Sequence, residues 1–309
     1  MAIYILRRVL AFIPVMFAIV TLTFFLIRLA PGGPFDSERV LSDEAMRRLE
    51  AAYNLDAPLH VQYFDYLKGV VQGDLGPSFR KPSRTVTEWI VLRLPVSLEL
   101  GAYALGVALI IGLGAGLVAS LRPNTATDYV PMSLAMAGIC IPNFVLGPLL
   151  VLVFALWLEW LPVAGWRAPA DKILPSLTLG ALYAAYVARL TRGSMLEVMA
   201  QDYIRTARAK GLSEAGVVLR HALRGGVQPV VAFLAPATAN LLTGSFVVET
   251  IFQVPGLGRE FVEAAFNRDY TMIIGTVLVY ALLVMTLNLV ADIAHAWLDP
   301  RARRTLAHG

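Results

Sequence analysis

The sequence has little charge for its length and almost no cysteine. Of its 309 residues, 16% are charged, whereas a soluble domain carries about a quarter charged residues. The single cysteine, Cys140, excludes an intrachain disulfide and any site that needs several cysteines. The net charge of +4 is small and fits a membrane protein with positive loops better than a nucleic-acid-binding protein.

The sequence also lacks the short motifs of nucleotide-binding and hydrolytic sites. It contains no G-x-x-x-x-G-K-[ST] phosphate loop, no H-E-x-x-H motif and no G-x-S-x-G motif. The glycine-rich residues 112–116 lie inside an apolar run, which disfavours a nucleotide loop. The histidines stand apart without ligand spacing: His60, His221, His295 and His308. We therefore expect no catalytic residue, no metal site and no cofactor bound by this chain.

Long apolar runs take the place of these features. The chain is 57% hydrophobic with a mean hydropathy of +0.65, and about 20 apolar residues suffice to cross a bilayer. The runs that reach or approach this length cover residues 9–27, 95–120, 129–158, 174–190, 229–250 and 272–298. The expected fold is an all-α polytopic membrane protein with six transmembrane helices.

The distribution of basic residues predicts how these helices are oriented. Short loops on the cytoplasmic side of a membrane carry an excess of Lys and Arg. The basic residues gather near the N-terminus, in residues 189–229 and near the C-terminus, so we expect both termini to be cytoplasmic. The first run should remain in the protein, because residues 28–34 end it without the small-residue cleavage site of a signal peptide.

The chain is expected to divide into two units. Residues 1–94 would form the first transmembrane helix and an extracytoplasmic segment, in which the sequence predicts amphipathic helices at 43–53 and 61–71. Residues 95–309 would form a core of five transmembrane helices. Within this core, Gly112 and Gly116 form a small-xxx-small pair that favours close helix contact.

The most basic segment, here called the basic loop (residues 189–229), has a helix–break–helix pattern. Its seven basic residues are Arg189, Arg192, Arg205, Arg208, Lys210, Arg220 and Arg224. Asp202 is expected to cap a short helix that runs through Lys210. Gly211 would end it in the left-handed conformation, and Ser213 would cap a second helix. Such a protrusion suits a partner's cleft; a positive loop that only sets orientation is the alternative.

The apolar helices show no energy source of their own. A charge at mid-bilayer costs ~2.5–3.5 kcal/mol on insertion scales and marks ion coupling, but Glu99, Glu249 and Asp292 are expected near helix ends. An ion-coupled secondary transporter, the rival class, would need an ion site and internal symmetry. A membrane enzyme would need clustered histidines or carboxylates, and a structural scaffold would show no nucleotide-dependent change in access. The basic loop could instead receive work from a partner.

Residues 205–211, Arg-Thr-Ala-Arg-Ala-Lys-Gly, are followed after nine residues by His-Ala-Leu at 221–223. This pattern resembles the cytoplasmic EAA loop of binding-protein-dependent ABC importer permeases. Arg205 stands where that family usually has glutamate, and Arg224 where it has proline. The Thr-Ala-Arg-Ala-Lys-Gly form is typical of the dipeptide and oligopeptide subfamily.

The resemblance extends over nearly the whole chain. Further matching segments are residues 29–32, 73–78, 248–252, 255–258, 267–270 and 299–301. On these segments the chain is identified as a member of the dipeptide, oligopeptide and nickel permease group. Residues 30–39 and 62–68 of the outer segment are most similar to the B-type subunit of oligopeptide permeases.

The resemblance implies a type I ABC importer permease fold and a transport subunit rather than an enzyme. The chain would form half of the pathway for oligopeptides; dipeptides, nickel chelates or glutathione are the alternatives within the family. The implied partners are a second homologous permease, two cytoplasmic ATPase subunits that use ATP and Mg, an extracytoplasmic peptide-binding protein, and membrane lipid. The implied location is the bacterial inner membrane.

Two groups of site residues are expected. The coupling helix that would dock in a groove of an ATPase comprises Tyr203, Ile204, Arg205, Thr206, Ala207, Arg208, Ala209, Lys210, Gly211 and Leu212. The candidates for an outer gate are Pro255, Gly256, Gly258 and Phe261. They form a Gly/Pro turn followed by an apolar helical stripe, together with Phe266, between two spans; an ordinary loop is the alternative.

Overall fold

The computed structural model describes residues 2–30, 33–35, 44, 51, 53–243 and 245–298. Within these residues the secondary structure is helical, with one isolated β-bridge between Pro77 and Thr85 and no strand. The helix expected at 43–53 falls almost entirely outside the described residues, as does the segment 299–301. The helix expected at 61–71 is present as α3 (Leu59–Val71).

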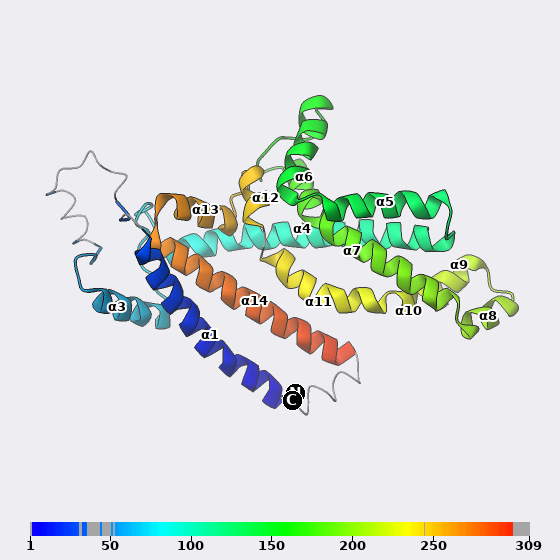
Figure 1. Ribbon diagram of the computed structural model, residues 1–309, viewed down its shortest axis with the longest axis horizontal. Coiled ribbons are helices and arrows are strands. Elements are labelled where there is room, and N and C mark those ends of the chain that lie inside the picture. Colours follow the sequence, from blue (N-terminus) through cyan, green and yellow to red (C-terminus); the bar gives the residue numbers. More distant parts are fainter. Residues whose placement is uncertain are drawn as a thin grey trace.

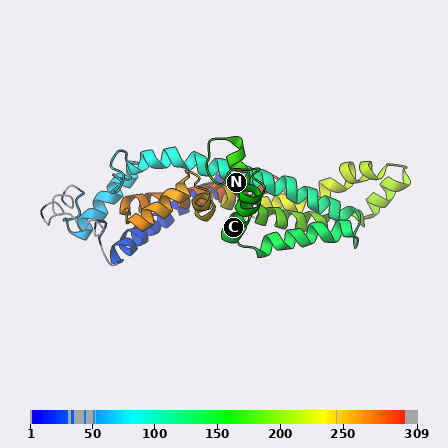
Figure 2. The ribbon, with the colours of Figure 1, turned by 90° about the horizontal axis from the view of Figure 1, so that it is seen from above.

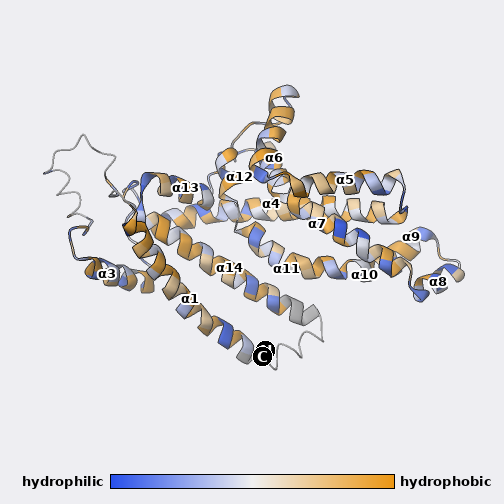
Figure 3. Ribbon diagram, in the orientation of Figure 1, coloured by the Kyte–Doolittle hydropathy of each residue, from blue (hydrophilic) through white to orange (hydrophobic). Residues whose placement is uncertain are grey.

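In the part of the chain that the structure describes, four helices are long and apolar enough to cross a membrane. They are α1 (Ala2–Leu29), α4 (Val86–Leu121), α7 (Ile173–Met199) and α14 (Tyr270–Leu298). Apolar residues dominate the length of α1, α4 and α14 (Figure 3). These helices confirm the predicted spans at 9–27, 95–120, 174–190 and 272–298, and α7 continues nine residues past its predicted end, from 190 to Met199.

Two further spans are bent. The run predicted at 129–158 is split into α5 (Ala126–Cys140) and the pair α6 (Asn143–Leu150) and η1 (Val151–Trp157), which meet at 115°. Pro142 explains the break, because a proline disfavours helical backbone in the preceding residue, and Ile141 is extended at φ −89° and ψ 116°. The second bent span, Gln228–Ile251, contains α11 (Gln228–Leu242) and α12 (Phe246–Ile251). It bends by 42° within α11, between Leu234 and Pro236. With each pair counted as one span, the described chain has six.

The helices lie in an elongated bundle with two differently built ends (Figure 1). One end carries α3 and α13 (Leu257–Asn267). The opposite end carries α8 (Asp202–Ala209) and α9 (Glu214–Gly216), and the view from above shows the same separation (Figure 2). Hydrophilic residues gather at α8 and α9 (Figure 3). The basic loop and the candidate gate turn are therefore far apart.

The bundle is held together along α4 and α7, which pack against each other over much of their lengths. The predicted glycine pair lies at this contact. A Cβ on Gly112 would lie 2.7 Å from the carbonyl oxygen of Ala184, and one on Gly116 would lie 2.4 Å from that of Ala188. Only glycine allows backbones this close, as expected for small residues at membrane helix interfaces.

We expect Gly116→Ala to destabilise the bundle, because the added methyl has no room and overpacking costs about 1–3 kcal/mol. Gly114→Ala is the matched control on the same helix, since a Cβ there meets nothing within 4 Å and alanine favours a helix over glycine by about 1 kcal/mol. Thermal unfolding of the purified protein in detergent measures both. Equal melting temperatures for the two variants would show that the contact is not tight.

Candidate functional site

The first candidate site is the elbow, defined here as residues 202–226. It consists of α8, a turn, and a continuous helical rod formed by α9, η3 (Val217–Ala222) and α10 (Leu223–Gly226). Ile204 and Ala207 of α8 are buried against Val217, Val218 and Met195. Two of the ten predicted docking residues, Ile204 and Ala207, therefore anchor α8 to the bundle and are turned away from any partner.

The remaining predicted docking residues form one exposed surface. They are Tyr203, Arg205, Thr206, Arg208, Ala209, Lys210, Gly211 and Leu212. The surface combines basic side chains with the exposed rings and methyls of Tyr203 and Leu212. Such a mixture suits a protein partner, because aromatic residues and Arg are enriched at interfaces.

The turn of the elbow has the predicted backbone, with one correction. Gly211 adopts φ +80°, and the Ser213 hydroxyl accepts a hydrogen bond from the Gly216 N–H at 3.3 Å. The prediction that Asp202 caps α8 was wrong, because Gln201 holds the cap position and Asp202 is the first helical residue. There its carboxylate lies near the positive end of the helix dipole.

An ion pair braces the turn from inside the elbow. The Arg208 guanidinium donates to both carboxylate oxygens of Glu214, at 2.8 and 3.3 Å. Both side chains are substantially exposed, so the pair contributes at most about 1 kcal/mol to stability. Its geometric effect is to hold α8 and α9 at a fixed angle across Gly211.

Two of the seven basic residues lie outside the elbow, within α7. Arg192 forms a two-pronged pair with the buried carboxylate of Asp128 at the start of α5, at 2.5 and 2.7 Å. Asp128 also accepts the N–H of Asn124 at 2.9 Å. Arg189 lies over the ring of Tyr186. Arg192 thus ties the α4–α5 connection to α7 just before the elbow, a role that the sequence pattern did not reveal.

The far end of the elbow is also fixed to α7. The Ser194 hydroxyl donates to the carbonyl oxygen of Gly226. A Cβ on Gly226 would overlap the Met195 side chain, so the two helices touch at this glycine. Because both α8 and α10 are attached to α7, a push on the elbow reaches the transmembrane bundle without passing through a flexible linker.

The second candidate site is the turn at residues 255–258 with α13. Gly256 and Gly258 are buried, Pro255 and Phe261 are half-buried, and the side chain of Phe266 is 86% exposed. The turn is therefore packed inside the fold, while Phe266 offers the exposed apolar surface of α13. Among the predicted gate residues, Gly256 and Gly258 are glycines for a structural reason: a carboxylate lies against both of them.

That carboxylate is Glu249 of α12, which is fully buried. Two of the three acids expected near helix ends form ion pairs: Glu99 with Lys172, and Asp292 with Arg8 at 3.1 Å. Glu249 differs from both, because it is buried and forms no ion pair within the described residues. Burying an unpaired carboxylate costs several kcal/mol unless hydrogen bonds replace its hydration.

Hydrogen bonds from α4 and α13 replace the hydration of Glu249. The Ser97 hydroxyl donates to Oε1 at 2.8 Å, and the Arg259 N–H donates to Oε2 at 3.0 Å. Ser97 also accepts the Leu257 N–H at 2.8 Å. The first turn of a helix leaves such N–H groups free and favours an anion. Glu249 and Ser97 therefore cap α13, whose own cap residue is Gly256.

Ion pairs connect α13 to α4 and to the segment that precedes α4. Lys81 contacts Glu260 at 2.5 Å and Glu263 at 3.1 Å, while Arg93 of α4 contacts Glu260 at 3.1 Å. Burial acts to lower the pKa of Lys81, but the two carboxylates outweigh it and raise that pKa. Burial acts to raise the pKa of Glu263, but Lys81 and Arg259 outweigh it and lower that pKa. Both shifts favour the charged forms of Lys81 and Glu263.

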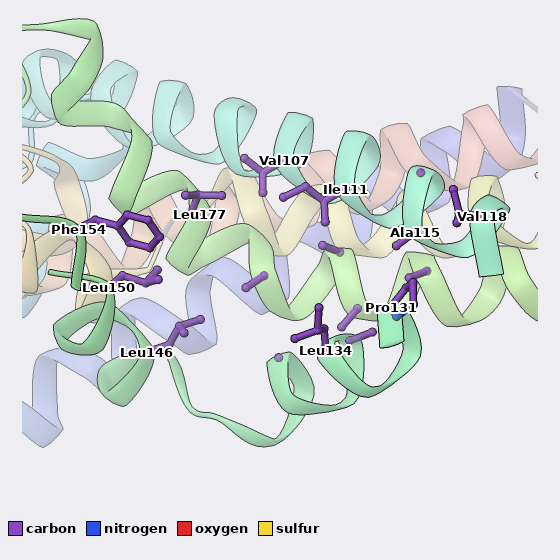
Figure 4. A pocket seen from close by; sticks show the side chains of 17 residues that line it. Val107, Ile111, Ala115, Val118, Pro131, Leu134, Leu146, Leu150, Phe154 and Leu177 are labelled. Carbon is purple, nitrogen blue, oxygen red and sulfur yellow. The ribbon is translucent and has the colours of Figure 1, made fainter. Parts of the chain in front are cut away.

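The bundle also has an open apolar pocket of about 600 Å³ between α4, α5, the α6–η1 arm and α7 (Figure 4). Its lining includes Ile111, Leu134, Leu146, Phe154 and Leu177 and contains no polar side chain. A peptide backbone placed there would leave its N–H and C=O groups unpaired, at a cost of several kcal/mol. The pocket therefore does not suit a peptide.

Two family models match the chain. One, described as a binding-protein-dependent transport system inner membrane component, matches residues 108–304. The other, for the N-terminal part of binding-protein-dependent transport system membrane components, matches residues 1–101.

Curated relatives are similar over nearly their full length. The oligopeptide transport system permease protein OppB of Escherichia coli K12 is 46% identical over 302 residues, covering 97% of this chain and 99% of that protein. The dipeptide transport system permease protein DppB of Bacillus subtilis 168 is 45% identical over 303 residues, with 98% of each covered.

A solved structure shares the fold. It is a crystal structure of an amino acid ABC transporter with histidines, with a TM-score of 0.53 and 17% identity. The match covers 67% of this chain and 92% of that one.

We expect Gly211→Val to loosen the elbow, because a β-branched residue in the left-handed region costs about 1–3 kcal/mol. Hydrogen exchange should speed up at amides 202–226 by on the order of tenfold, in proportion to that local loss. Gly193→Val in α7 is the control, since a Cβ there meets nothing within 4 Å and its φ is ordinary. Unchanged exchange in Gly211→Val would mean that the turn does not depend on its left-handed residue.

Proposed function

Because the chain belongs to the family of binding-protein-dependent transport system inner membrane components, it is a transmembrane permease subunit of an ABC importer, and we propose that its cargo is an oligopeptide. It is a transport subunit and not an enzyme. The observation that carries the cargo proposal is the full-length similarity to permeases named for oligopeptide and dipeptide transport. Dipeptides, nickel chelates and glutathione are the alternatives within the family.

The family implies an ATPase and a binding protein as partners. The finer composition that we propose is two permease subunits, this chain and a homologue, with two cytoplasmic ATPases and one extracytoplasmic peptide-binding protein. ATP and Mg are used by the ATPases. We place the elbow and both termini in the cytoplasm, which is supported by the basic residues of the elbow and by its position at the opposite end from α13.

The elbow is the proposed contact with the ATPase. Its exposed basic and apolar surface is held on a body that is attached to α7 at both ends. Movement of the ATPase would therefore be transferred to α7 and, through the close α4–α7 contact, to the rest of the bundle. Rigid-body rotation of packed helices is a common form of such transitions.

The α12–α13 region is the proposed outer gate. Phe261 and Phe266 supply apolar surface on α13, and the ion pairs of Lys81 and Arg93 hold this helix at the extracytoplasmic end. A transport pathway must release its cargo, so it binds weakly. Selectivity would then belong mostly to the binding protein.

We expect Lys210→Glu to reduce the rate of ATP-driven peptide uptake at least tenfold, because it reverses an exposed charge on the proposed docking surface. The measurement is uptake of a labelled oligopeptide into proteoliposomes that contain the assembled importer. Arg167→Glu, the same charge change on an exposed residue of the opposite side, should transport normally.

The Arg208–Glu214 pair allows docking to be separated from folding of the elbow. Arg208→Glu should reduce uptake both by opening the brace and by reversing a surface charge. The swap Arg208→Glu with Glu214→Arg restores the brace, so uptake that stays low in the swap supports a direct contact of Arg208 with the ATPase. Full recovery would assign Arg208 to bracing alone.

The class of transporter is tested in the same vesicles. Uptake should require ATP and the ATPases, and peptide should compete better than nickel chelates or glutathione. Uptake that runs on an ion gradient with the ATPases absent would favour an ion-coupled secondary transporter and contradict the proposal.

A further inference from the structure

The hydrogen bonds to the Glu249 carboxylate come from two segments of the chain. Glu249 and the Arg259 N–H belong to one continuous stretch, residues 245–267, and the Gly258 N–H also faces the carboxylate. Ser97 is the contribution of α4. The carboxylate thus holds α12 and α13 to each other, and the Ser97 hydroxyl holds both of them to α4.

The stretch 245–267 is packed so tightly around the carboxylate that its parts must move together. A Cβ on Gly256 would lie 2.4 Å from Glu249 Oε2 and 2.6 Å from Ser97 Oγ. A Cβ on Gly258 would lie 2.9 Å from the backbone of Phe246. The Val254 N–H also donates to the Glu249 carbonyl oxygen at 2.9 Å. We call residues 245–267 the gate body.

The attachments of the gate body to α4 differ in how far they can stretch. Arg93 reaches Glu260 and the Pro255 carbonyl oxygen through a long side chain that can follow a shift of the gate body. Ser97 has one rotatable bond before its hydroxyl and must lose its contacts when the helices separate. Its hydroxyl and the α13 amides donate to the same carboxylate, so these hydrogen bonds are alike in kind, and Ser97 differs in belonging to a separate helix, α4.

We propose that Glu249 is the positioning residue that keeps the gate body together during transport, and that the Ser97 contact is the one that opens when the permease turns outward. This rests on the proposed function. The α13 amides stay bound to Glu249 throughout, so the carboxylate never faces the membrane or the cargo without its hydrogen bonds.

The test follows the access of a thiol at position 97 in the assembled importer. The variant Ser97→Cys, whose S–H keeps a hydrogen-bond donor at this position, is made with Cys140→Ser, which removes the native cysteine. We expect a membrane-impermeant thiol reagent to label the introduced thiol slowly without nucleotide, as Ser97 is fully buried here. With ATP and vanadate, labelling should be at least tenfold faster. Equal rates in the two conditions, in an importer whose uptake is active, would overturn the proposal.

Glu249→Gln tests the carboxylate itself. Without the charge, the gate body is expected to separate from α4 in the resting state, so labelling of the introduced thiol should become fast with no nucleotide. The maximal uptake rate should fall about tenfold, in line with loss of a charge-assisted hydrogen bond, while the affinity for the loaded binding protein stays unchanged. Labelling that remains slow would overturn the role of Glu249.

Two further variants complete the test. Glu88→Gln is the matched control, since it is the same substitution on α4 and Gln preserves the capping box with Thr85; its labelling should match that of the parent. Gly256→Ala should reproduce the Glu249→Gln result by displacing the carboxylate without changing charge, and it serves if Glu249→Gln fails to assemble. Absence of ATP-driven uptake in the wild-type importer would reject the proposed function, whereas active uptake with nucleotide-independent labelling rejects this inference alone.

Discussion

The whole structure depends on the close contact of α4 with α7, where carbonyl oxygens of one helix meet glycines of the other. Between membrane helices there is little hydrophobic driving force, because lipid is as apolar as the side chains. Close packing of small residues therefore has to supply the attraction. Gly112 and Gly116 do so in the last third of α4, and each candidate site is attached to one of these two helices.

The carboxylates of the bundle are paired with groups from neighbouring helices. Asp128 with Arg192, Glu99 with Lys172, and Glu249 with Ser97 and the α13 amides all have partners from another helix. Except for the α13 amides, which are close to Glu249 in the sequence, the partners lie in elements far apart along the chain. These contacts fix how the helices are placed along one another, which apolar packing alone specifies weakly.

The sequence predicts most of the fold because its strongest signals are local. The lengths of the apolar runs predicted the spans, and the amphipathic pattern of residues 61–71 predicted α3. Gly211 and Ser213 predicted the turn of the elbow. The break at Pro142 was not predicted, because a proline in a membrane helix either kinks it or is tolerated, depending on its neighbours. Glu249 was placed correctly near a span end, but its burial depends on Ser97, which lies 152 positions away. A glycine at the cap position of α13, with no capping side chain nearby, was the one available hint.

The length of α4 has a mechanical consequence. Its 36 residues span about 54 Å at 1.5 Å per residue, well beyond the ~30 Å hydrocarbon thickness of a bilayer. Leu117 near one end packs on the cluster that anchors α8, and Ser97 and Arg93 near the other end contact the α12–α13 turn. A tilt of about 10° about its midpoint displaces each end by roughly 5 Å on that geometry. The helix can thus work as a lever that converts a small swing on one face of the membrane into an opposite swing on the other.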